Sequence, residues 1–162
     1  MNKYMQIAIE AAKEGMKTNQ GGPFGAVIVR NGVIVAVAHN EVLGTNDPTA
    51  HAEVVAIRRA TAILQRFHIP ECEMYTTCEP CPMCLSAIHW AGIQKLYYGA
   101  DRHDAEKGGF DKDFIYQLMD GTADSPLLQP EIIDKQECAN LFEEWNHKTD
   151  RIMYCENKSI EE

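Results

Sequence analysis

Two apolar runs joined by a two-residue turn decide the fold: GAVIVR at residues 25–30, NG at residues 31–32 and VIVAVA at residues 33–38. Both runs are rich in β-branched residues, which favour β-strands. An Asn-Gly pair tolerates the positive φ angles that a type I′ turn requires at both of its central positions. The stretch therefore predicts two antiparallel strands joined as a hairpin.

Helices are predicted on both sides of this hairpin. Upstream, apolar residues recur at helical spacing from Met5 to Met16, after a candidate N-cap at Asn2. Downstream, a polar loop leads to a helix over residues 48–65, with Asp47 as its N-cap and a proline at the first helical position.

Strands and helices then alternate along the chain. Strands are predicted at residues 73–77 and 94–99, with a helix at residues 82–90 between them. A helix of about ten residues between two strands is typical of a crossover connection in a partly parallel sheet. The fold class is therefore α/β, with helices on both faces of the sheet.

The last third of the chain has a less regular pattern. It predicts a helix at 111–118, an edge strand at 131–134 and a terminal helix at 135–153. The terminal helix carries Leu141, Phe142 and Trp145 on its apolar side. Because 162 residues suit one compact domain, we expect a single domain with a core of about residues 1–120.

The chain is acidic, and the acidity lies in its second half. It contains 24 Asp and Glu against 15 Lys and Arg, which gives a net charge of −9. Residues 1–70 carry 7 basic and 5 acidic side chains, whereas residues 71–162 carry 8 and 19. This distribution offers no basic surface to nucleic acid or to an anionic membrane, so we expect small-molecule partners.

The thiols are expected to be reduced. Charged residues interrupt any apolar signal segment in residues 1–15, and no stretch is long enough to span a bilayer, so we expect a cytoplasmic protein. In that compartment cysteine thiols more often bind metals or take part in catalysis than form disulfides. The six cysteines are Cys72, Cys78, Cys81, Cys84, Cys138 and Cys155.

One histidine and two cysteines have the spacing of a metal site. His51 lies at the start of one predicted helix, and Cys81 and Cys84 lie at the start of the next. The separation of 30 residues between His51 and Cys81 is what a helix and a returning strand require. We therefore expect the three side chains to meet at one end of the sheet.

The chemistry of these side chains suits Zn²⁺. One imidazole and two thiolates are typical zinc ligands, and three protein ligands leave the fourth tetrahedral position to water. The positive end of each helix dipole favours thiolates and lowers the proton affinity of that water. Glu53, two residues after His51, is a base within reach of the water but outside the ligand set.

Cys78 leaves two other interpretations open. With Cys81 and Cys84 it forms Cys-x-x-Cys-x-x-Cys, a pattern compatible with an iron–sulfur cluster, which requires a fourth thiolate. Alternatively, Cys78 is the fourth ligand of a structural zinc site, which would leave Glu53 without a role.

Four motifs carry a resemblance to a known family: GGPFGAV at 21–27, NDPTAHAE at 46–53, TCEPCPMC at 77–84 and GFDKDFIY at 109–116. His-x-Glu followed by Pro-Cys-x-x-Cys is the signature of zinc deaminases, in which the glutamate is the general acid and base. The chain resembles the cytidine and deoxycytidylate deaminase superfamily, and within it the small bacterial guanine deaminases.

The resemblance implies a three-layer αβα, cytidine-deaminase-like fold with a central mixed sheet of about five strands. It also implies one Zn²⁺ per chain on His51, Cys81 and Cys84, with Glu53 as the catalytic residue. The implied substrate contacts are Asn40, Phe24, the backbone of Ala52, Trp90, Asp111 and Asp113. The alternative interpretation of two of these residues is structural: Asn40 would be a turn residue that ends a strand, and Phe24 would be a core residue.

One position departs from the family pattern. In the guanine deaminases two consecutive acidic residues follow the Gly-Phe pair. Here Asp111 occupies the first of these positions, Lys112 occupies the second, and Asp113 follows. Either one of these neighbouring acids takes the role of the second acid, or the substrate differs.

The implied function is hydrolytic deamination of a free purine base, guanine to xanthine and ammonia. The alternatives are a nucleoside deaminase for guanosine or cytidine, a tRNA adenosine deaminase and a non-catalytic, zinc-stabilised binding module. Residues 131–162 carry 4 basic and 9 acidic side chains, which opposes tRNA binding. The resemblance also implies a homodimer, in which residues 121–162 either cross to the partner or cover their own sheet.

Overall fold

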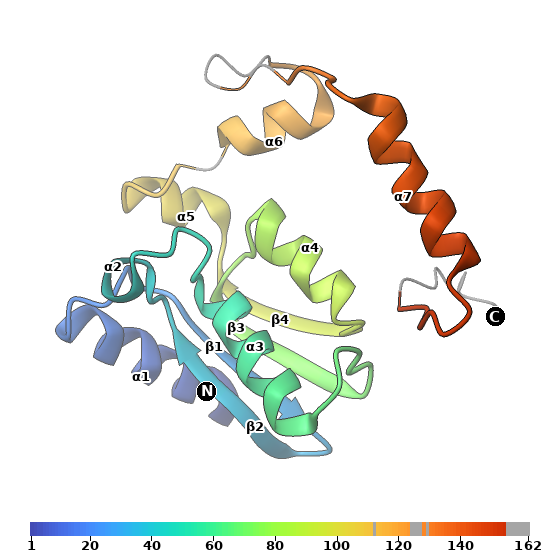
Figure 1. Cartoon of the computed structure of the whole chain (residues 1–162). Coiled ribbons are helices and arrows are strands. Elements are labelled where there is room, and N and C mark those ends of the chain that lie inside the picture. Colours follow the sequence, from blue (N-terminus) through green and yellow to red (C-terminus); the bar gives the residue numbers. More distant parts are fainter. Residues whose placement is uncertain (112, 124–127, 129, 155–162) are drawn as a thin grey trace. The chain divides into compact units, whose positions relative to one another are not determined.

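The computed structural model describes residues 1–111, 113–123, 128 and 130–154 of the chain. These residues belong to two compact units, Met1–Ala123 and Asp124–Glu162, and each unit is described by itself. The first unit contains the whole sheet and the helices around it (Figure 1).

The sheet of the first unit is mixed and has four strands in the order β2-β1-β3-β4. The strands are β1 (Gly25–Arg30), β2 (Val33–His39), β3 (Cys72–Cys78) and β4 (Lys95–Ala100). Strand β1 pairs antiparallel with β2 and β3, whereas β3 and β4 are parallel. The α/β class and the mixed sheet are thus confirmed, with four strands in the described residues in place of about five.

The hairpin that connects β1 to β2 forms as predicted. Asn31 and Gly32 have φ angles of +50° and +79°, the left-handed conformation that a type I′ turn requires. Val27 pairs with Val37, and a register shift occurs between Ile28 and Val29.

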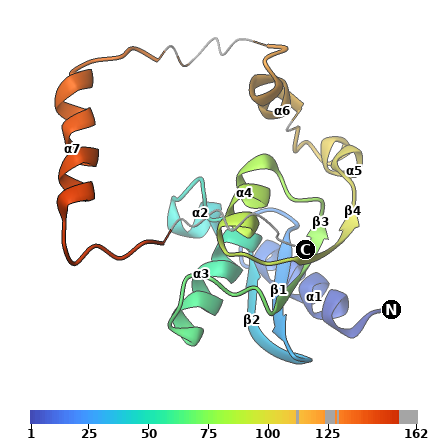
Figure 2. The same cartoon turned by 90° about the vertical axis from the view of Figure 1, so that its right-hand side faces the viewer.

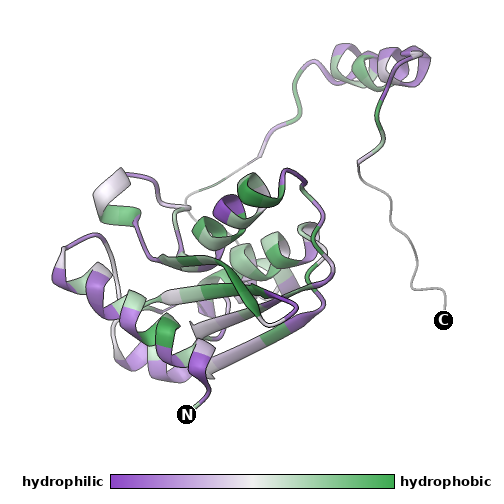
Figure 3. Cartoon of the chain, turned by 90° about the horizontal axis from the view of Figure 1, so that it is seen from below, coloured by the Kyte–Doolittle hydropathy of each residue, from purple (hydrophilic) through white to green (hydrophobic). Residues whose placement is uncertain are grey.

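Helices cover both faces of the sheet (Figure 2). On one face lies α1 (Lys3–Lys17), whose buried Ala8 packs with Val27 and Val29 of β1. Hydrophobic and hydrophilic residues both occur along α1, as its amphipathic pattern predicts (Figure 3). The side chain of Asn2 caps this helix by accepting hydrogen bonds from the backbone N–H groups of residues 4 and 5.

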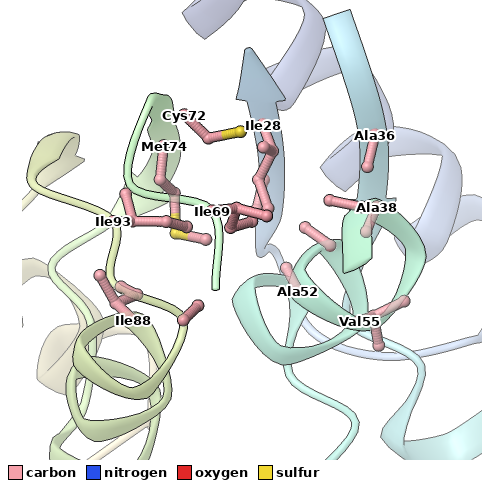
Figure 4. Packing of buried hydrophobic residues seen from close by; sticks show 14 of the residues in the cluster. Ile28, Ala36, Ala38, Ala52, Val55, Ile69, Cys72, Met74, Ile88 and Ile93 are labelled. Carbon is pink, nitrogen blue, oxygen red and sulfur yellow. The ribbon is translucent and has the colours of Figure 1, made fainter. Parts of the chain in front are cut away.

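The larger core lies on the opposite face, under α3 (Ala52–Leu64) and α4 (Pro82–Trp90). Ile28 and Met74 belong to this core, in which Met74 lies on the side of Ile88 of α4 and Ala38 of β2 lies beside Val55 of α3 (Figure 4). Residues of β1 therefore alternate between the two cores, as the two-residue period of a strand requires. The resulting three layers, helix, sheet and helices, match the implied αβα arrangement.

The predicted start of one helix and the predicted end of another were wrong. Helix α3 begins at Ala52 rather than at residue 48, because the carboxylate of Asp47 accepts hydrogen bonds from the backbone N–H and the hydroxyl of Thr49 (2.8 and 2.6 Å) and forms a local turn. The terminal helix α7 is Lys135–His147, shorter than the predicted 135–153.

The predicted strand at 131–134 is absent, since these residues are exposed and have no strand to pair with. The helix predicted at 111–118 is displaced by two residues and is α6 (Asp113–Asp120). Two short helices were not predicted, α2 (Val42–Thr45) and α5 (Arg102–Lys107). No helix of the described residues is both long and apolar enough to cross a membrane.

Candidate active site

The predicted metal ligands come from the starts of two helices. His51 is the N-cap of α3, and Cys81 is the N-cap of α4; both have extended backbone conformations. Pro82 occupies the first position of α4, where the missing N–H costs nothing. Cys84 follows in the first turn of that helix and is fully buried. The structure thus brings all three side chains to the adjoining ends of α3 and α4.

The spacing of the donor atoms fits a tetrahedral zinc ion. His51 Nδ1 lies 3.6 Å from Cys81 Sγ and 3.4 Å from Cys84 Sγ, and all three donors lie within 4.8 Å of one another. Typical Zn–N and Zn–S bond lengths at tetrahedral angles place such donors about 3.5 Å apart. Side chains that satisfy this geometry need only small adjustments to hold the ion.

The electrostatic environment favours a thiolate at Cys81. A hydrogen bond from Cys84 lowers the pKa of Cys81 to about 4, with a further contribution from His51. The same hydrogen bond raises the pKa of Cys84, as do its burial and the adjacent carboxylate of Glu53. Cys81 is therefore the more acidic of the two thiols, and a divalent cation would favour deprotonation of both.

Glu53 lies beside this group of ligands and outside it. It is the second residue of α3, is 5% exposed and interacts with the thiol of Cys84. The cluster of possible metal ligands in the described residues contains His51, Cys81 and Cys84 only. A buried carboxylate that is adjacent to the ligands without joining them has the position required of a general base.

Asn40 and Phe24 are held next to the metal ligands by backbone hydrogen bonds. The N–H of Asn40 donates to the carbonyl oxygen of Phe24 at 2.9 Å. The N–H of Glu41 donates to the carbonyl oxygen of Ala50 at 2.9 Å, which joins the residue after Asn40 to the residue before His51. These bonds bring three segments that are distant in the sequence to one place.

Phe24 contacts another aromatic ring, and Ala52 lies at the start of α3. The ring of Phe24 is half-buried and makes an edge contact with Phe110, with a centroid distance of 4.9 Å. Ala52 is the first residue of α3, so its backbone N–H is one of the four that have no acceptor within the helix. It is positioned to donate to a ligand next to His51.

Of the other three predicted contacts, Trp90 lies away from the metal ligands, whereas Asp111 and Asp113 follow Phe110, whose ring contacts Phe24. Trp90 is the last residue of α4, about 13 Å along the helix from Cys81 at 1.5 Å per residue, and is 68% exposed. Asp111 and Asp113 are exposed at the start of α6, where the carboxylate of Asp111 accepts a hydrogen bond from the N–H of Asp113. Lys112 lies outside the described residues.

Cys78 is buried apart from the metal ligands. Its sulfur lies 3.8 Å from the carbonyl oxygen of Asp101, and it is not one of the three clustered donors. In the part of the chain that the structure describes, no fourth thiolate accompanies His51, Cys81 and Cys84. This arrangement favours a three-ligand site over the iron–sulfur and four-ligand interpretations.

Tyr116 supports the cysteine turn and was not among the predicted site residues. Its hydroxyl donates to the carbonyl oxygen of Pro80 at 3.3 Å, and the guanidinium of Arg102 lies 5.3 Å from its ring centre. The backbone N–H of Arg102 in turn donates to the carboxylate of Glu79. The only sequence signal was the FIY motif at 114–116, because the contact joins residues 36 positions apart.

The site and the fold together define a class of protein. Residues 1–100 match the family described as the cytidine and deoxycytidylate deaminase zinc-binding region, and the chain belongs to this family. The guanine deaminase of Bacillus subtilis is 42% identical over 151 residues, which cover 93% of this chain and 97% of that protein. A tRNA-specific adenosine deaminase of Aquifex aeolicus is 32% identical over 90% of this chain and 93% of its own length.

A solved structure gives the same relationship. The X-ray structure of guanine deaminase from Bacillus subtilis superposes with a TM-score of 0.90 at 41% identity. The match covers 96% of this chain and all of that one. The likeness therefore extends through nearly the whole chain, beyond the residues of the zinc-binding region.

Proposed function

We propose that this chain is a zinc-dependent hydrolase that converts guanine and water to xanthine and ammonia. The observation that carries the proposal is the three-donor group of His51, Cys81 and Cys84, with the buried carboxylate of Glu53 beside it and outside it. The likeness to a guanine deaminase over 93% of the chain supports guanine as the substrate. Each chain would hold one Zn²⁺.

Glu53 transfers the protons in the proposed reaction. Zinc, which His51, Cys81 and Cys84 would hold, would lower the pKa of a bound water molecule toward neutrality. Glu53 accepts a proton as the water oxygen adds to the carbon that bears the amino group, and passes it to the adjacent ring nitrogen. Glu53 then takes the remaining proton from the hydroxyl on that carbon, which becomes the carbonyl, and delivers this proton to the departing amine. One C–O bond forms and one C–N bond breaks, and ammonia leaves.

The remaining site residues hold the ring. Asn40 and the N–H of Ala52 provide hydrogen bonds to ring or exocyclic atoms, and Phe24 provides an aromatic surface on which a purine can stack. One of the two acids that flank Lys112 compensates for the second acid of the guanine deaminases.

A panel of bases and nucleosides tests the substrate. We expect ammonia release from guanine by the zinc-loaded chain at a kcat/KM at least about tenfold higher than from guanosine, cytosine, cytidine or adenine. A tenfold ratio corresponds to one well-made polar contact. Preference for a nucleoside would contradict the choice of guanine. Release from none of them, at one zinc per chain, would favour the non-catalytic binding module.

The tRNA alternative deserves a separate measurement because several relatives are tRNA-specific adenosine deaminases. The excess of acidic residues in the second half of the chain opposes binding to a phosphate backbone. An anticodon stem-loop added to the guanine assay at low salt serves as the comparison substrate in the same panel.

We further propose a cytoplasmic homodimer in which residues 121–162 contact the partner. Large apolar side chains of the second unit, including Leu141 and Phe142, are 62% and 73% exposed within one chain, which favours a covering surface elsewhere. Cys72, Cys78, Cys81 and Cys84 are not joined in disulfides, which suits a reducing compartment. Sedimentation at micromolar concentration is expected to give a dimer, and a monomer would contradict this proposal.

A further inference from the structure

The carboxamide of Asn40 has one orientation in this structure. The side chain is 6% exposed, and its Oδ1 accepts a hydrogen bond from the backbone N–H of Val42 at 3.2 Å. A backbone N–H can only donate, so the oxygen must face Val42 and the amide nitrogen must face the other way. None of the hydrogen bonds found among the described residues is donated by Nδ2, which leaves this group to a ligand.

Gly21 provides the space for this orientation. A Cβ atom at position 21 would collide with Asn40 Oδ1, would lie 2.8 Å from Asn40 Cγ and would lie 2.5 Å from the carbonyl oxygen of Asn40. Gly21 is not among the glycines with positive φ, so its backbone conformation is open to any residue. The requirement for glycine at this position therefore comes from the close approach of Asn40.

A methyl group at position 21 would move the carboxamide of Asn40 within the candidate active site. The backbone of Asn40 is fixed at both ends, by its own N–H on Phe24 and by the bond from Glu41 to Ala50. The backbone therefore cannot follow a side chain that is pushed away, and the amide group must rotate or tilt. Either change breaks the bond from Val42 and moves Nδ2.

We infer that Gly21 is a positioning residue for substrate recognition, which it serves by holding Asn40 as a fixed hydrogen-bond donor. The inference rests on the proposed function, because it takes Asn40 as a contact of the purine. It adds a chemical requirement: the atom of the ligand that meets Asn40 must be an acceptor, such as a ring nitrogen without hydrogen or a carbonyl oxygen. A ligand that presents an N–H at this point is rejected.

A double-mutant cycle of Gly21→Ala and Asn40→Ala tests the inference. We expect Gly21→Ala alone to lower kcat/KM for guanine about tenfold, chiefly through KM, since one hydrogen bond to the ring is weakened in the ground state and the transition state alike. In the Asn40→Ala background the same change is expected to cost clearly less, because the carboxamide that it displaces is gone and only the close approach to the Asn40 carbonyl oxygen remains. Equal costs in the two backgrounds would overturn the inference.

The solubility of the variants is informative even if some of them fail to fold. If Gly21→Ala is insoluble and Gly21→Ala with Asn40→Ala folds, the collision acts through the Asn40 side chain, as inferred. If both are insoluble, the collision is with the backbone, and the positioning role is overturned. Wild-type turnover of guanine tests the proposed function separately; if another base is the substrate, the cycle uses that base.

Gly44→Ala is the matched control. Gly44 lies in α2, close in sequence to Asn40, and the three atoms nearest to a Cβ there all belong to the side chain of the half-buried Gln20, whose amide tip can move. We expect this variant to keep wild-type kcat and KM. A loss equal to that of Gly21→Ala would show that any added methyl group in this region disturbs the site, and would contradict a specific role for Gly21.

Discussion

Replacing Glu53 with glutamine is expected to lower kcat/KM for guanine by about 10²–10⁴-fold, the usual contribution of a positioned general acid and base. Glutamine has nearly the same size and shape but can neither accept the proton of the water nor deliver it to the amine. Glu53 is outside the group formed by His51, Cys81 and Cys84, so the variant should still bind one zinc per chain. Steady-state kinetics and metal content of the same preparation measure both quantities.

Glu73→Gln provides the matched control for this loss. Glu73 is also a partly buried carboxylate, but it lies on β3, accepts a hydrogen bond from the hydroxyl of Tyr75 and pairs with Lys95 at 3.0 Å. Its replacement should leave kcat/KM within about twofold. A zinc-loaded Glu53→Gln protein that kept activity within tenfold of wild type would overturn the assignment of the general base.

Local signals were sufficient to predict the elements that frame this glutamate. The hairpin follows from Asn31-Gly32, and the start of α4 follows from Pro82, since in each case the deciding preference lies within a few neighbouring residues. The convergence of His51 with Cys81 followed from the length of chain between them. The sequence therefore contained the main outline of the candidate metal site.

The predicted start of α3 was wrong because alternative hydrogen bonds compete there, and a sequence pattern does not reveal which of them forms. Asp47 and Pro48 have the appearance of a helix start, but Asp47 is engaged by Thr49 and the helix begins after His51. This shift of four residues is what makes His51 an N-cap and places Glu53 in the first turn. The side-chain hydrogen bond of Asp47 thus has a direct effect on the geometry of the site.

Contacts between distant segments were equally invisible in the sequence. The approach of Gly21 to Asn40 and the hydrogen bond from Tyr116 to Pro80 depend on how the loops pack, and no local preference encodes them. Trp90 shows the reverse case: its position at the end of α4 was predicted, but its 68% exposure was not, because exposure depends on what packs beyond the helix end.

Cys84→Ala is expected to remove both zinc and activity. Cys84 is one of the three proposed protein ligands and is fully buried in the first turn of α4. Changes in residues that merely orient a ligand reduce metal affinity about 10–100-fold, so loss of the ligand itself should exceed 100-fold. Turnover of guanine should fall to background, since two protein donors do not complete the set that holds the ion.

Cys72→Ala separates this effect from the loss of a buried thiol as such. Cys72 is 1% exposed on β3 and belongs to the hydrophobic core, where burial raises the pKa of its thiol. Its replacement creates a small cavity and should cost about 1 kcal/mol of unfolding free energy, with zinc content and kcat unchanged. Metal analysis after dialysis against a weak chelator compares the two variants. Equal zinc retention by both would contradict the ligand role of Cys84, because only the metal site distinguishes these two buried sulfurs.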